Sequence, residues 1–94
     1  MIISRKAEAE IPVFASHELA RGYFKSKYGN QFIMMSYEEV DEQTVYFYAL
    51  LLNPNAFYDG QKQLAIGEGF SGIEYLNSYQ SIEIFEDGRI HIIH

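Results

Sequence analysis

The eight residues from Val45 to Leu52, Val-Tyr-Phe-Tyr-Ala-Leu-Leu-Leu, are all apolar or aromatic, and they constrain the fold more than any other segment. Eight residues are too few for a membrane helix, which needs about 20. A half-buried strand alternates polar and apolar residues, and this run does not. It is typical of a strand that is covered on both faces of its sheet.

The chain of 94 residues is sized for one core, so we expect residues 1–94 to form a single domain. Its eight Tyr and seven Phe residues are not typical of a disordered chain. The absence of cysteine excludes a disulfide framework, a thiolate zinc site and a cysteine nucleophile. The N-terminus becomes charged at Arg5 and Lys6, which argues against a signal peptide. We therefore expect a cytoplasmic protein with no membrane anchor.

The net charge of −6 argues against direct nucleic-acid binding, which needs clustered Lys and Arg. The charge is unevenly distributed. Residues 1–30 carry five basic and three acidic side chains, and residues 31–94 carry two basic and ten acidic ones. A small basic patch is therefore expected only in the first third of the chain.

Residues 16–28 predict the clearest helix. Ser16 suits the N-cap, and Gly29 offers a left-handed stop. An apolar stripe at helical spacing needs a sheet to cover it. Its members are Leu19, Ala20, Tyr23, Phe24 and Tyr28.

Three strands are predicted before residue 54. Alternation over residues 7–13 favours a strand. Because Pro12 cannot donate a ladder hydrogen bond, this strand either lies at the edge of the sheet or ends there. Residues 31–39 and 44–53 predict two further strands, joined by the acidic stretch Glu38–Glu42. That stretch is polar enough to form the turn.

The segment after Asn53 is harder to interpret. Turn-forming residues predict a loop over 53–60, with Phe57 and Tyr58 in its middle. A short strand over 63–66 and a short second helix over 72–79 follow as expectations.

Residues 81–94 predict a β-hairpin around Asp87-Gly88, the dipeptide of a two-residue type I′ turn. That turn would place Phe85 opposite Ile90 and Ile84 opposite His91. It would also put Ile82, Ile84 and Ile93 on one face, and Phe85, Ile90 and Ile92 on the other.

Together these elements predict an α+β fold with a mostly antiparallel sheet of about four to six strands. The order is compatible with a ferredoxin-like βαββαβ arrangement, in which both helices would cover the same face. The opposite face would then invite a second copy or another protein.

No motif identifies an enzyme or a cofactor. The sequence 67–72 matches the glycine pattern of dinucleotide sites, but too short a helix follows it and Glu68 would lie beside the phosphates. His91 and His94 are three residues apart on a strand, so they point to opposite faces and predict no metal site. Catalytic residues remain unassigned, and an enzyme is disfavoured.

We therefore expect a small intracellular protein-interaction or regulatory module that self-associates through an apolar sheet face. The candidate interaction residues are aromatic and branched side chains, namely Tyr46, Tyr48, Phe57, Tyr58, Ile90 and Ile92.

Two alternatives remain open. A small-molecule site or enzyme could use Tyr58, Glu68, Ser71 and His91 near the 53–72 loops. An acidic inhibitor of a nucleic-acid enzyme would use the carboxylates of Glu38–Glu42.

Overall fold

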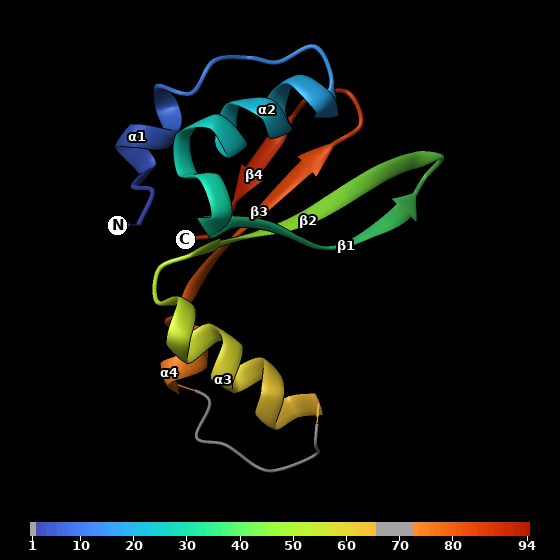
Figure 1. The fold of residues 1–94 in the computed structure, drawn as a ribbon. Helices are drawn as coiled ribbons and strands as arrows, with labels where there is room; N and C mark the ends of the chain where they lie inside the picture. The colour runs from blue at the N-terminus through green and yellow to red at the C-terminus, as the bar shows by residue number, and fades with distance from the viewer. Residues whose placement is uncertain (1, 66–72) are drawn as a thin grey trace.

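The computed structural model, which describes residues 2–65 and 73–94, contains one antiparallel sheet (Figure 1). The predicted antiparallel α+β class is confirmed, with four strands in the order β1-β2-β3-β4. The ferredoxin-like order is wrong, because each strand pairs with the next one in the chain. The strands are β1 (Phe32–Val40), β2 (Gln43–Leu51), β3 (Tyr79–Phe85) and β4 (Ile90–Ile92).

The predicted helix over 16–28 is confirmed as α2 (His17–Tyr28). The Ser16 side chain accepts a hydrogen bond from the backbone N–H of Leu19 at 3.3 Å, and Gly29 ends the helix at φ 59°. Ala20 and Phe24 are fully buried against the sheet. Leu19 is largely exposed, although the helical stripe included it. The 3₁₀ turn η1 (Gly29–Gln31) leads into β1.

The strand expected over residues 7–13 is wrong. Residues Arg5–Ala9 form the short helix α1, and the Ser4 side chain accepts from Ala7 N at 3.1 Å as its N-cap. The Ala, Glu and Lys residues at positions 6–10 are all good helix formers, and the β-branched Ile11 and Val13 come only after the helix has ended.

The loop over 53–60 and the strand over 63–66 are also wrong, since both fall largely in α3 (Pro54–Ala65). The Asn53 side chain accepts from Ala56 N at 3.2 Å, and Pro54 takes the first helical position. An Asn-Pro pair is therefore a helix start here. Gly60 lies where an added Cβ would meet the ring of Tyr75, so the helix needs glycine for close packing.

The second helix exists but is shorter than the expected 72–79. It is α4 (Ile73–Leu76), and Tyr79 already belongs to β3. The glycine pattern at 67–72 lies outside the described residues. Figure 1 shows α3 and α4 together at one end of the sheet.

The C-terminal hairpin is confirmed, but its register is shifted by one residue. Ile84 pairs with Ile90, and Glu83 pairs with His91. Phe85 N donates to Arg89 O at 2.9 Å, and Gly88 has φ 93°. The loop thus has three residues, with the glycine in the position of a G1 bulge, in place of the expected two-residue turn.

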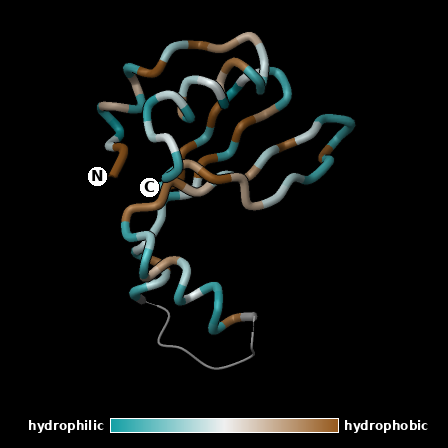
Figure 2. Tube along the Cα trace, viewed as in Figure 1, coloured by the Kyte–Doolittle hydropathy of each residue, from teal (hydrophilic) through white to brown (hydrophobic). Residues whose placement is uncertain are grey.

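This shift places Ile82, Ile84, Ile90 and Ile92 on the same face of the sheet, and the expected division between two faces is wrong. These residues belong to a core cluster with Phe24 of α2 and with Tyr48 and Leu50 of β2. A smaller cluster on the other face contains Ala49, Leu51 and Phe57 of α3. The helices therefore cover opposite faces, which explains why β2 needs no alternation (Figure 2).

The β1–β2 hairpin extends beyond both helical layers (Figure 1). Its turn is made by Asp41 and Glu42, both with positive φ, at 51° and 66°. Glu38 and Glu39, which belonged both to the predicted strand 31–39 and to the expected connecting stretch, are strand residues. The molecule measures 41 × 30 × 21 Å as a result.

Candidate interaction surface

The edge strand β1 carries the most conspicuous exposed surface. Seven of its nine residues, from Met34 to Val40, are exposed. Four of these seven are large apolar side chains, namely Met34, Met35, Tyr37 and Val40. A long edge strand with exposed apolar side chains favours pairing with another strand.

The free edge also presents unpaired backbone groups. The two-residue turn closes on the pair Val40 and Gln43, and hydrogen-bonded pairs then alternate along the ladder. The N–H and C=O groups of Tyr37 and Glu39 therefore point away from β2. Met35 interrupts this alternation as a β-bulge between Met34 and Ser36.

Beyond the bulge, Lys25 of α2 occupies the edge. Its Nζ donates to the carbonyl of Phe32 at 3.2 Å. That carbonyl consequently points outward, as does the backbone of Met34 two residues later. An accessible stretch of edge thus runs from Met34 to Glu39.

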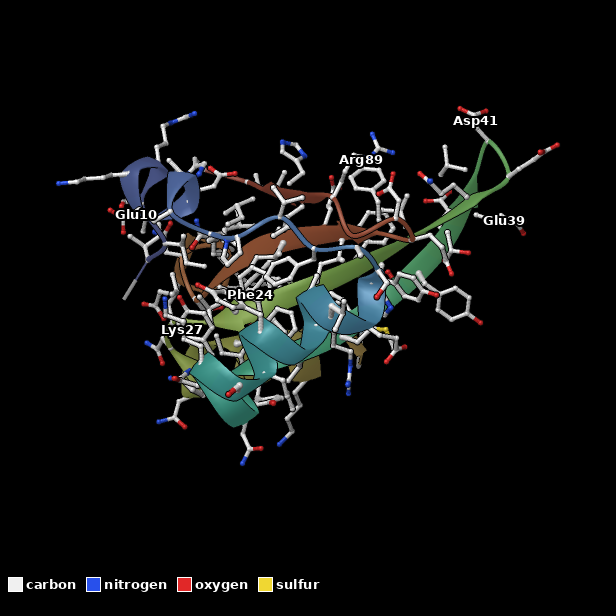
Figure 3. All side chains as sticks on the ribbon, turned by 90° about the horizontal axis from the view of Figure 1, so that it is seen from above. Glu10, Phe24, Lys27, Glu39, Asp41 and Arg89 are labelled. Carbon is white, nitrogen blue, oxygen red and sulfur yellow. The ribbon has the colours of Figure 1, made fainter. Side chains whose placement is uncertain are left out.

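Opposite charges lie at the two ends of this strand. Figure 3 shows Lys27 at the C-terminal end of α2, and Glu39 and Asp41 at the far hairpin tip. Lys25 and Lys27 occupy the last turn of the helix, where the dipole favours cations. A partner with the reverse order of charges would match this surface.

The sheet face opposite α2 is only partly covered. Beyond the cluster around Phe57, it carries buried Val45 and half-buried Phe47 and Phe85. A groove of about 280 Å³ opens there, lined by Met35, Phe47 and Ile93 among others. Glu83 also lines it, and the Glu83 carboxylate lies 2.9 Å from His91 Nδ1. The uncovered part of this face is therefore mixed in polarity.

The six predicted interaction residues fall into two groups. Tyr48, Phe57 and Ile92 are buried in the core of the single chain, so they offer no surface in this conformation. Tyr46 and Ile90 are half-buried, and Tyr58 is exposed on α3. Tyr58 is the one exposed member of this set, so the six residues do not form a single exposed surface.

Tyr48 instead holds a buried histidine. Its hydroxyl lies 2.7 Å from His17 Nε2, and the His17 ring stacks on Tyr46 with 3.6 Å between centroids. Burial lowers the pKa of His17, although Glu18 and Glu86 act in the opposite direction. Burial therefore favours the neutral form of this packed imidazole.

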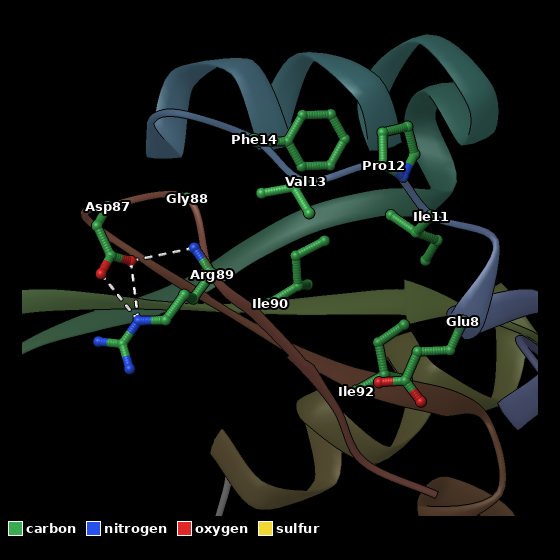
Figure 4. Close-up of a pocket in the computed structure, with 10 residues that line it drawn as sticks. All are labelled: Glu8, Ile11, Pro12, Val13, Phe14, Asp87, Gly88, Arg89, Ile90 and Ile92. Carbon is green, nitrogen blue, oxygen red and sulfur yellow. Dashed lines mark hydrogen bonds and ion pairs between the residues drawn. The ribbon is translucent and has the colours of Figure 1, made fainter.

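The groove between residues 11–14 and β4 has a volume of about 470 Å³ (Figure 4). Its walls are apolar, and Ile90 and Ile92 point into it. Asp87 accepts from both Nε and the backbone N–H of Arg89, and that backbone hydrogen bond lowers the pKa of Asp87. The acid at this end of the groove is thus already paired.

The residues of the proposed small-molecule site do not converge where the structure describes them. Tyr58 lies on α3, and His91 lies on β4 beside Glu83. Glu68 and Ser71 lie outside the described residues. Within ranges 2–65 and 73–94, no cluster of three metal-ligating side chains occurs, and no helix combines the length and apolar character needed to cross a membrane.

Sequence reasoning missed the exposed side chains of β1. Met34, Met35 and Tyr37 stand in a segment correctly predicted as a strand, but a pattern along one strand does not reveal its neighbours. The useful signal was the change from apolar residues to Glu38 and Glu39 within this strand, because charges are typical of an edge.

No family model, curated protein or solved structure matches this chain.

Proposed function

We propose that this protein is a small protein-interaction module that self-associates through the β1 side of its sheet. The supporting observation is the combination on one edge strand of unpaired backbone groups with exposed Met34, Met35, Tyr37 and Val40. Burial of such apolar side chains would supply the binding energy, and the acidic tip would influence partner choice.

An exposed edge strand whose nearby polar groups are already paired favours interaction over catalysis. In the part of the chain that the structure describes, the polar groups around the groove of Figure 4 are engaged with one another. Glu8 lies 2.7 Å from His94, and Asp87 holds Arg89. A general acid or base needs a group that can face a substrate.

Size-exclusion chromatography with light scattering at micromolar concentration tests the proposal. The chain of 10.9 kDa should elute with at least twice that mass. Tyr37→Lys should raise the dissociation constant by about tenfold or more, because it removes apolar area from both copies and adds a charge at the edge. Tyr58→Lys, on the exposed side of α3, is the matched control and should leave the mass unchanged.

A strictly monomeric protein would contradict the proposal. Equal effects of Tyr37→Lys and Tyr58→Lys would place self-association elsewhere on the molecule. Either result is readable because both positions are exposed, so both variants should retain the wild-type circular dichroism.

A second candidate function uses the hairpin tip as an acidic inhibitor of a nucleic-acid enzyme. The favouring observation is that Glu38, Glu39, Asp41 and Glu42 are all exposed on a projecting hairpin. Such binding would weaken strongly with salt and with neutralisation of these four carboxylates. Binding to a basic enzyme that persists after the neutralisation would exclude it.

A further inference from the structure

We infer that two copies join through antiparallel pairing of their β1 strands, with Met34 of one copy opposite Tyr37 of the other. A two-fold axis would pass beside Met35 and Ser36 and place both contacts symmetrically. This inference rests on the proposed self-association and adds the interface, the register and the charge pairs that fix it.

Backbone geometry restricts the register. Outward-facing groups on one strand must meet outward-facing groups on the other. They belong to Phe32 and Met34 before the bulge, and to Tyr37 and Glu39 after it. Pairing the first half with the second half satisfies both sets and brings the two bulges to the axis.

The competing register pairs the second half of the strand with itself. Tyr37 would then lie opposite Glu39, and the two copies of Glu38 would face each other directly. Like charges in directly opposite positions are destabilising. The chosen register instead sets Glu38 opposite Ile33, which separates the carboxylates.

The apolar side chains fit this arrangement. Met34 and Tyr37 both project toward the α2 face, because they pair with Tyr48 and Tyr46 of β2. Their exposed fractions are 53% and 69% in the single chain. The register sets them opposite each other twice, so four exposed side chains become cross-strand neighbours.

The charges fit as well. Glu39 of one copy comes opposite Phe32 of the other, whose carbonyl holds Lys25 Nζ at 3.2 Å. Lys25 exchanges this carbonyl for the incoming carboxylate, and the carbonyl is released to the new ladder. Because the acidic tip and the basic helix end lie at opposite ends of β1, the two-fold axis matches them twice (Figure 3).

Lys25 and the bulge could also act against the dimer, since a lysine or a bulge on an edge strand commonly protects that edge from pairing. The two roles predict opposite effects of Lys25→Ala on self-association. Lys25→Ala should weaken self-association severalfold if Lys25 pairs with Glu39. It should strengthen self-association if the lysine only blocks the edge, and that result would overturn the inference.

A charge exchange gives the sharper test. Lys25→Glu and Glu39→Lys each create like charges at both contacts of their own homodimer, so each should dissociate about tenfold more readily. Mixing the two single variants creates opposite charges at both contacts, and affinity should return to near the wild-type value. Sedimentation equilibrium measures all three constants, and thermal unfolding of each variant checks the fold.

Cross-linking tests the register, because the chain contains no cysteine. Directly opposite residues lie about 5.5 Å apart, within reach of a disulfide. An oxidised mixture of Met34→Cys and Tyr37→Cys should form a mixed dimer. Neither variant should do so alone, because its two copies lie roughly 10 Å apart along the strands. Tyr37→Cys with Glu39→Cys is the control for the competing register.

The outcomes separate this inference from the proposed function. A wild-type protein that stays monomeric overturns both. A dimer in which the mixed charge variants do not recover, or in which only the control pair cross-links, retains self-association and overturns this interface. Recovery together with a Met34–Tyr37 cross-link supports the complete arrangement.

Discussion

Phe57 is predicted to be the anchor that fixes α3 to the sheet. It is 1% exposed and belongs to the cluster with Ala49 and Leu51. Its ring lies 5.6 Å from that of Tyr75 and 5.3 Å from that of Tyr79. Truncation to alanine leaves a cavity between the helix and the sheet, where few other buried side chains can fill the space.

The expected cost follows from the area involved. A buried aromatic ring removes about 150–250 Å² from water, which at about 25 cal/mol per Å² gives roughly 4–6 kcal/mol before relaxation. Measured Phe→Ala substitutions in cores cost about 3–5 kcal/mol. Because a domain of this size is stable by about 5–15 kcal/mol, Phe57→Ala should remove a large part of the stability.

Urea unfolding followed by far-ultraviolet circular dichroism measures this loss. With a slope of about 1–3 kcal/mol per molar urea, the midpoint should fall by roughly 2 M. Leu64→Ala, 53% exposed on the same helix, is the control and should stay within about 0.5 kcal/mol. A loss below about 1 kcal/mol for Phe57→Ala would show that α3 is not packed as described, and the reasoning would fail.

Three further predictions concern single positions. Gly88→Ala should lower the free energy of unfolding by at least about 2 kcal/mol, because φ is 93° and an added Cβ would meet a backbone carbonyl oxygen. Gly22→Ala, in open space on α2, should raise it by about 0.5–1 kcal/mol, and thermal unfolding compares the two variants. The pKa of His17 lies below its unfolded value of 6.5, so the unfolded chain binds more protons and the stability should fall as the pH drops through 6.5. His17→Gln should flatten this part of a plot of melting temperature against pH. Gln80 accepts a hydrogen bond from Ile3 N at 2.8 Å and donates one to Ile3 O at 3.0 Å, so Gln80→Ala should lower the free energy of unfolding by about 1–3 kcal/mol and speed amide exchange at Ile3. Unchanged exchange at Ile3 would contradict this pair of hydrogen bonds.

The elements that the sequence predicted well have local signals that agree with their tertiary setting. For α2, the cap at Ser16, the stop at Gly29 and the apolar spacing all indicate the same boundaries. The continuous apolar run of β2 correctly indicated cover on both faces, and the structure supplies it with α2 on one face and α3 at one end of the other.

The predictions of the 53–60 loop and of the hairpin turn were wrong because the residues there are common in two kinds of local structure. Asn53 and Pro54 are common in loops, but they also form a helix N-cap and first position, and the second meaning applies here. Asp87-Gly88 favours a two-residue turn, yet the glycine conformation and the Phe85–Arg89 hydrogen bond make a three-residue loop. A single residue then decides which face each isoleucine occupies.

The candidate surface on β1 could be predicted only with knowledge of the strand order. The predicted interaction residues lie in the most apolar segments, and several of them, such as Tyr48 and Phe57, are buried because they are apolar. The apolar side chains of β1 are exposed because the strand order β1-β2-β3-β4 places this strand at an edge of the sheet. Within residues 32–40, only the charges of Glu38 and Glu39 are typical of an edge strand.

The uncovered part of the sheet connects the fold to the proposed function. The helices account for both faces around Leu50 and Leu51, but the hairpin tip projects beyond them. On the same edge strand, the apolar side chains of Met34 and Tyr37 are also exposed. Association through β1 would extend the sheet and continue the layering that the single chain begins.

Residue-resolved amide hydrogen exchange of β1 tests the central claim most directly. In the dilute single chain, the Glu38 amide should be protected because it faces β2, and the Tyr37 amide should exchange rapidly because it faces outward. As concentration rises and the mass doubles, protection should appear at Tyr37 and leave Glu38 nearly unchanged. A doubling of mass with the Tyr37 amide still unprotected would contradict pairing through this edge.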